Sequence, residues 1–159
     1  LPRIVEKQPA TKLVLVGGFS YRSVLQARAE ELGVGSMVVF VDRVPRENLG
    51  LYYALGDIFV FPSLTDTQGL VLHEAAGAGL PLVLCDPDVS LVFEPGVTGL
   101  LAHNTPLSLS KTVVGLLKDD ELRARMASAA KDKAHEFRED AQAEKLASIY
   151  RQCIKNHTN

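Results

Sequence analysis

Short apolar runs alternate along the chain with longer stretches in which apolar residues recur every three or four positions. A short apolar run bounded by glycine or proline predicts a buried strand, whereas the longer spacing predicts an amphipathic helix. The predicted strands are Lys12–Val16, Met37–Val41, Asp57–Phe61, Leu82–Cys85 and Gly99–Ala102. The predicted helices are Tyr21–Leu32, Pro45–Leu55, Leu70–Ala78, Pro106–Lys118, Asp120–Phe137 and Ala141–Ile154.

This alternation is typical of βαβ units. It predicts an α/β fold, namely a Rossmann-like, doubly wound parallel sheet followed by C-terminal helices, in a single domain over residues 1–159. Ligands of such sheets bind outside the carboxyl ends of the strands. The loops expected there are Gly17–Ser20, Asp42–Val44, Ser63–Gly69 and Asp86–Gly96.

Composition narrows the class of protein. A hydrophobic content of 47%, a charged content of 23% and a net charge of −2 are ordinary for a globular protein and argue against a nucleic-acid-binding face. Cys85 and Cys153 form neither a disulfide scaffold nor a metal-binding spacing, which suits a reducing compartment. No apolar run approaches the roughly 18 residues of a membrane span. We therefore expect a cytoplasmic protein, in which a local basic patch would still allow peripheral contact with an anionic membrane.

The loop Ser63–Gly69 leads directly into a predicted helix. The first amides of a helix lack partners and lie at the positive end of its dipole, which favours a phosphate there. Gly69 would allow close approach, so the backbone amides of Gln68, Gly69 and Leu70 are candidate donors to a diphosphate. The alternative is that Thr65, Asp66 or Thr67 caps the helix start.

Glu74 stands in an otherwise apolar and small-residue helix, LVLHEAAGAG. A carboxylate on a helix between two buried strands is seldom placed for packing, and it could accept hydrogen bonds from two adjacent hydroxyls of a ribose or hexose. The alternative is that Glu74 lies on an exposed stripe of the helix. Together, Asp66 and Glu74 flank the helix start. The neighbouring His73 could reach either the helix surface or the cleft, and we expect it at the surface.

The segment PSLTDTQGLVLHEAAGAGLPLVLCD resembles the signature of GT-B glycosyltransferases of the family-4 type, P-S-x-x-E-G-F-G-x-x-x-x-E-A-x-A-x-G-x-P-V-V. The match continues in order through LVLVGG, VVFVDRVPRENLGLYYALGDIFVFPS and EPGVTGLLAHNTPLSLSKTVVGLLKD, and so covers essentially the whole chain. This resemblance implies the C-terminal half of a GT-B fold, the domain that binds the nucleoside diphosphate sugar.

The resemblance implies a role for each acid of the family's E-x7-E motif. Glu74 matches the acid that binds the ribose hydroxyls, and Asp66 matches the catalytic-site acid that contacts the donor sugar. Since Asp66 stands where the family has Glu, its carboxylate reaches one methylene less far. The family's G-F-G is Thr67-Gln68-Gly69 here, a form similar to the branch that glycosylates lipids such as diacylglycerol.

The remaining implied contacts to the donor are largely made by the backbone. The diphosphate would meet the turn Gln68, Gly69 and Leu70 and the glycine turn Gly17 and Gly18. The base would be cradled by the loop around Arg43 and Val44. The resemblance implies no cofactor and no metal.

The implied reaction is retaining transfer of a hexose from a UDP- or GDP-sugar to a lipid or glycan acceptor. The family's G-R-x-x-x-E-K-G turn, whose Arg and Lys neutralise the leaving diphosphate, would lie upstream of Leu1, as would the acceptor domain. We therefore expect a fragment, lacking the N-terminal acceptor domain and the start of this domain, that is inactive by itself. Two alternatives stay open: a GT-B type sugar-nucleotide epimerase and a non-catalytic nucleotide-sugar-binding module.

Overall fold

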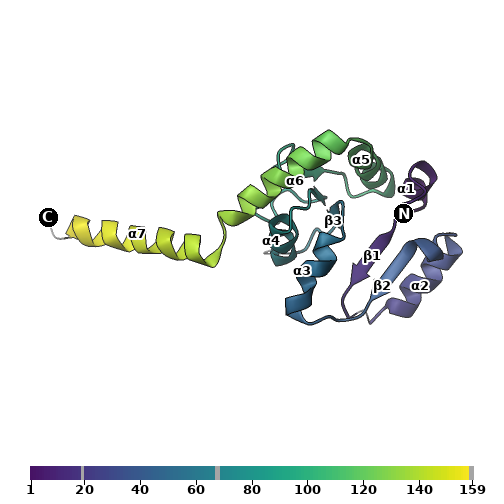
Figure 1. Ribbon diagram of the computed structural model, residues 1–159, viewed down its shortest axis with the longest axis horizontal. Helices are drawn as coiled ribbons and strands as arrows, with labels where there is room; N and C mark the ends of the chain where they lie inside the picture. Colours follow the sequence, from purple (N-terminus) through teal and green to yellow (C-terminus); the bar gives the residue numbers. More distant parts are fainter. Residues whose placement is uncertain (19, 67–68, 158–159) are drawn as a thin grey trace.

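The computed structural model describes residues 1–18, 20–66 and 69–157. Its strands are β1 (Leu13–Val16), β2 (Val38–Val41), β3 (Phe59–Phe61), β4 (Leu82–Leu84) and β5 (Gly99–Leu101). Its helices are α1 (Pro2–Lys7), α2 (Arg22–Glu31), α3 (Arg46–Ala54), α4 (Leu70–Gly77), α5 (Pro106–Lys118), α6 (Asp120–His135) and α7 (Glu139–His157), with a 3-10 turn η1 (Gly35–Met37) before β2. Strands and helices alternate up to β4, which confirms the predicted α/β class. Figure 1 labels the alternating elements from α1 to α4.

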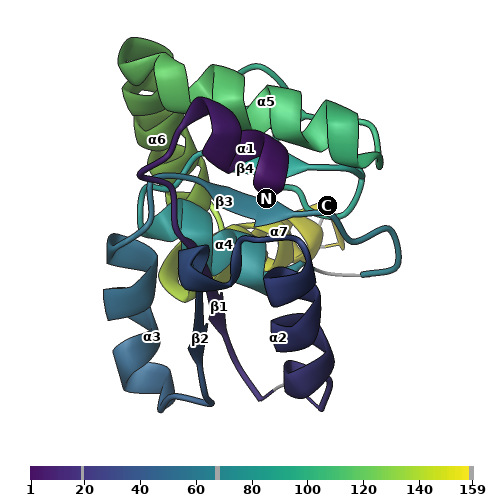
Figure 2. The same cartoon turned by 90° about the vertical axis from the view of Figure 1, so that its right-hand side faces the viewer.

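The strands form two parallel ladders. In the first, β1 pairs with β2, and Leu13 lies opposite Val38. In the second, β4 lies between β3 and β5, with Leu82 opposite both Phe59 and Gly99. Figure 2 shows β1 and β2 running down the view while β3 and β4 run across it. The parallel architecture that the sequence predicts is therefore divided between two ladders, whose carboxyl ends point in different directions.

The hydrophobic core surrounds β4, whose three residues are all buried. Because side chains alternate along a strand, Leu82 and Leu84 face one cluster and Val83 faces the other. Helix α4 packs on the first face, and α5 contributes Val113 and Leu116 to the second. Helix α6 contributes to both clusters, with Ala130 in the first and Met126 in the second. This packing fixes α4 firmly against the sheet.

The β1–β2 unit is much less buried. Side chains of a parallel sheet are normally covered on both faces, yet Leu13, Val14 and Val39 are 37%, 44% and 43% exposed. Within the described ranges, β1 also has no strand on its second edge. The amide of Gly17, just after β1, points toward β2 and donates to the Val41 carbonyl at 3.0 Å. Because successive amides of a strand point to opposite edges, every second amide of β1 points away from β2, toward the open edge.

The last helices begin at capped positions. The Thr105 hydroxyl accepts from the Ser108 amide at 3.2 Å at the start of α5, and the Asp119 carboxylate accepts from the Leu122 amide at 2.8 Å at the start of α6. Helix α7 extends away from the body of the molecule in Figure 1. In the part of the chain that the structure describes, no helix is both long and apolar enough to span a membrane.

Candidate functional site

The start of α4 is shaped by Gly69 and Asp66. Gly69 adopts a left-handed conformation, with φ 53° and ψ 40°, and its amide donates to Asp66 Oδ1 at 2.7 Å. A Cβ at this position would lie 2.8 Å from Leu72 Cδ1 and 3.1 Å from the Val89 carbonyl oxygen. Both the backbone conformation and the close neighbours therefore require glycine here.

This arrangement bears on the predicted phosphate donors. The Gly69 amide, predicted to bind a diphosphate, donates to the Asp66 carboxylate instead, and Gly69 is the residue that precedes the first turn of α4. Leu70 opens the helix with an exposed side chain, and Gln68 lies outside the described residues. Asp66 is thus held at the helix start, where a phosphate would have to share its donors with a carboxylate.

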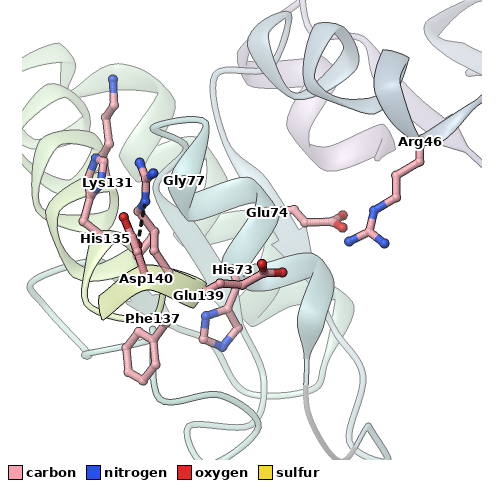
Figure 3. Close-up of a pocket in the computed structure, with 11 residues that line it drawn as sticks. Arg46, His73, Glu74, Gly77, Lys131, His135, Phe137, Glu139 and Asp140 are labelled. Carbon is pink, nitrogen blue, oxygen red and sulfur yellow. Dashed lines mark hydrogen bonds and ion pairs between the residues drawn. The ribbon is translucent and has the colours of Figure 1, made fainter. Parts of the chain in front are cut away.

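Glu74 is half-buried one turn further along α4, so it does not occupy a solvent stripe. Its Oε2 accepts a hydrogen bond of 2.8 Å from the hydroxyl of Tyr53 on α3. Glu74 also lines an open cavity of about 720 Å³, into which Arg46 projects from the first turn of α3. Figure 3 shows the Arg46 guanidinium and the Glu74 carboxylate pointing toward one another. The site therefore contains an oriented acceptor facing a cation.

Two of these residues were not predicted from the sequence. Tyr53 fits the apolar stripe of its helix, and its half-buried position explains why the pattern indicated packing alone. The available signal was its hydroxyl, since a partly buried tyrosine normally finds a hydrogen-bond partner. Arg46 carries no such signal, because it follows Pro45 at an exposed helix start.

The rest of the cavity is formed by α4, by α6 and by the chain that leads into α7. Its further lining residues are His73, Gly77, Lys131, Ala134, His135, Phe137, Arg138, Glu139 and Asp140. Arg138 and Asp140 pair with each other at 3.3 Å on this wall, as the dashed line in Figure 3 marks. Positive and negative groups therefore both line the cavity, which suits a ligand that carries anionic and hydroxyl groups.

The prediction that His73 lies at the helix surface is wrong. Its Nε2 lies 3.0 Å from Ser90 Oγ, and its ring meets the edge of Phe137 at a centroid distance of 5.0 Å. Helix α4 turns this position toward the loop after β4 because Leu72 and Ala75 occupy the core face. Burial lowers the pKa of His73 from its ordinary value of 6.5.

This shift predicts a pH dependence of stability. As pH falls below 6.5, the unfolded chain binds a proton at His73 before the folded chain does, so the free energy of unfolding decreases. Stability measured by urea denaturation should therefore fall less steeply with acid in His73→Gln than in the parent chain. The exposed His135→Gln is the control and should retain the parent slope; equal slopes for all three proteins would contradict the prediction.

The glycine turn and the predicted base loop lie together. A Cβ on Gly18 would lie 3.8 Å from both Nε and Nη2 of Arg43, so this arginine covers the turn that follows β1. Gly17 has φ 142°, and Val44 is half-buried beside Arg43. These four residues follow the strands of the β1–β2 ladder, whereas Asp66 and Gly69 follow β3 and Glu74 lies on α4. The structure thus brings Arg43 and Val44 to the Gly17–Gly18 turn, and Figure 2 shows that the β1–β2 ladder that they follow runs in a different direction from β3 and β4.

Across residues 1–18, 20–66 and 69–157, no group of three or more His, Cys, Asp or Glu side chains is arranged to hold a metal ion.

Comparisons with known proteins bear on the family and on the fold. A family model described as "Glycosyl transferases group 1" matches residues 1–133. The chain is 35% identical over 130 residues to D-inositol 3-phosphate glycosyltransferase from Corynebacterium glutamicum, a match covering 80% of this chain and 31% of that protein. It is also 35% identical over 141 residues to a GDP-mannose-dependent alpha-(1-6)-phosphatidylinositol monomannoside mannosyltransferase from Mycolicibacterium smegmatis, covering 82% and 36%.

Among solved structures, the pneumococcal O-GlcNAc transferase GtfA in complex with UDP and GlcNAc superposes with a TM-score of 0.79 at 18% identity. That match covers 96% of this chain and 32% of the neighbour, and it supports the fold. The chain spans about a third of the length of the curated relatives that it matches.

Proposed function

Because this chain belongs to the group 1 glycosyl transferases, we propose that it binds the nucleotide of a nucleoside diphosphate sugar and serves as the donor domain of a hexosyltransferase. The observation that carries the proposal is the carboxylate of Glu74, held by Tyr53 at 2.8 Å on the wall of an open cavity. A carboxylate fixed in this way is suited to accept hydrogen bonds from the two hydroxyls of a ribose.

The phosphates and the base require other groups. In the proposal, the diphosphate lies between the start of α4, at Leu70, and the Gly17–Gly18 turn, where Arg43 supplies a cation. Helix-start amides and an arginine are the donors that phosphates prefer in proteins. In the same proposal, the backbone around Val44 contacts the base, and Asp66 contacts the hydroxyls of the donor sugar.

The test is calorimetric titration of the chain with UDP and with GDP. A relative at 35% identity is named GDP-mannose-dependent, which makes GDP the first nucleotide to try. We expect a saturable heat with one of the two nucleotides at concentrations up to about the millimolar range, in which weak specific binding falls. If neither nucleotide binds to a sample that circular dichroism shows to be folded, the donor-site proposal fails.

We further propose that the transfer retains the configuration of the sugar and needs no metal, with an acceptor that is a lipid or a glycan. Catalysis would then depend on positioning and on stabilising the leaving diphosphate. The measurement uses a protein that contains this chain together with an acceptor-binding region. Proton NMR of the product should show the anomeric configuration of the donor; an inverted product would contradict retention, and an epimerised sugar released without acceptor would replace transfer by epimerisation.

Cytoplasmic location and peripheral contact with a membrane stay predictions from the sequence. A lipid acceptor would account for the membrane contact, since the donor domain would then lie beside a membrane surface. Vesicle flotation of a protein containing this chain, with and without anionic lipid, measures that contact directly.

A further inference from the structure

Tyr53 links two helices at the candidate site. It lies in the last turns of α3, and its hydroxyl donates to Oε2 of Glu74 on α4 at 2.8 Å. Both side chains are half-buried, so this hydrogen bond is partly shielded from water. Removing the hydroxyl would leave Glu74 without this donor.

The ring of Tyr53 is fixed by packing. It meets Phe59 of β3 at a centroid distance of 5.8 Å and an interplanar angle of 57°, and Phe59 in turn stacks on Phe61 at 6.4 Å. All three rings pack against the buried cluster that contains Leu72. The position of the hydroxyl is therefore set by the strand and the core, before any ligand is present.

The direction of this hydrogen bond is also fixed. Burial, the hydrogen bond to Glu74 and the negative charge of Glu74 all raise the pKa of Tyr53 well above the ordinary tyrosine value of 10. The phenol therefore stays protonated and acts as the donor, and Glu74 acts as the acceptor. Arg46 also lines the cavity, and Figure 3 shows its guanidinium pointing toward Glu74. The carboxylate is thus held by a neutral donor and faces a cation across the cavity.

We propose that Tyr53 is a positioning residue, which holds the Glu74 carboxylate in the orientation that receives the ribose hydroxyls and so sets a preference for ribonucleotides over 2′-deoxyribonucleotides. This inference rests on the proposed function, because it assumes that Glu74 meets the ribose. A carboxylate oriented in advance loses less freedom when the nucleotide binds, which strengthens its hydrogen bonds to the ribose. The gain is largest for a ligand that carries both ribose hydroxyls, because a 2′-deoxyribonucleotide offers Glu74 only the 3′-hydroxyl.

The variant Tyr53→Phe tests the inference, because it removes the hydroxyl and keeps the ring that packs on Phe59. Calorimetry measures the affinity of the chain for the ribonucleotide, UDP or GDP, and for its 2′-deoxy analogue. We expect the parent to prefer the ribonucleotide, and the variant to bind it about 3- to 10-fold more weakly, the loss typical of one hydrogen bond. Affinity for the 2′-deoxy analogue should change less, so the ratio of the two affinities should fall.

Tyr52→Phe removes the neighbouring hydroxyl and should leave both affinities unchanged. A second arm combines Tyr53→Phe with Glu74→Gln, and we expect the double variant to bind the ribonucleotide as weakly as Glu74→Gln alone. The inference is overturned if Tyr53→Phe weakens both nucleotides equally, or weakens binding further in the Glu74→Gln background, since both results indicate a structural role. If Glu74→Gln itself leaves ribonucleotide affinity unchanged, the ribose site of the proposed function fails, whatever Tyr53 does.

Discussion

Replacing Glu74 with alanine is expected to weaken nucleotide binding by about 1–3 kcal/mol, the range for leaving hydrogen bonds to a charged acceptor unmade. Glu74 is the one acid on the described cavity wall that α4 presents, and Tyr53 already holds it in a single orientation. In the variant, the ribose hydroxyls would lose their acceptor and Arg46 would lose the opposing charge. Calorimetric titration with UDP or GDP measures the change.

The matched control is Glu144→Ala, which removes the same side chain from an exposed position on α7. Glu144→Ala and Glu74→Ala each remove one negative charge, so an effect of net charge alone would appear in both variants. Parent-like affinity in a folded Glu74→Ala protein would remove Glu74 from the nucleotide site. A loss of similar size in Glu144→Ala would show that net charge, rather than the site, is responsible.

The largest effect on stability is expected from Gly99→Ala. Gly99 lies on β5 directly opposite Leu82 of the buried strand β4. An added Cβ would collide with the carbonyl oxygen of Leu82 and would lie 2.7 and 2.8 Å from its carbonyl carbon and amide nitrogen. Because backbone atoms at the centre of the sheet cannot move aside as a side chain does, we expect a loss of about 3 kcal/mol, the upper end for an inserted methyl group.

Gly115→Ala is the control, since Gly115 lies on α5 and an added Cβ there meets nothing within 4 Å. Alanine is the better helix former, so this variant should be as stable as the parent or more stable by up to about 1 kcal/mol. Urea denaturation followed by circular dichroism compares the two. A Gly99→Ala protein with parent stability would mean that β5 does not approach β4 as closely as the structure indicates.

The secondary structure could be predicted from local pattern. The bounds of α5 agree with those predicted, and the five strands begin and end within two residues of the predictions. Helix α3 begins one residue later than expected, because Pro45 adopts an extended ψ of 144° and so stands before the helix. The 3-10 turn η1 was not predicted, since three residues are too few to show periodicity.

The arrangement of the strands could not be predicted in the same way. The alternation of strands and helices indicates parallel pairing, but it does not say which edges meet. Leu13 and Val14 are apolar, so the sequence predicts that both are buried, whether or not another element packs over them. Their exposed fractions follow from the tertiary structure alone.

The candidate site shows the same division. Glu74 could be singled out because a charged residue in an apolar helix conflicts with packing. For Gly69 the sequence left two possibilities, a phosphate donor or a capped helix start. Only the structure shows that its amide donates to Asp66. Tyr53 and His73 could not be placed from the sequence, because their partners, Glu74 and Ser90, lie 21 and 17 residues away on other elements.

The division of the strands into two ladders has a consequence for how a nucleotide would be held. Opening the β1–β2 unit breaks no ladder hydrogen bond of β3, β4 and β5, so its local opening free energy is expected to be lower than that of the buried core. A nucleotide that touched both Arg43 and Glu74 would act as a noncovalent crosslink between the two units. Part of its intrinsic affinity would then be used to fix one unit against the other, and hydrogen exchange at β1 would slow when the ligand binds.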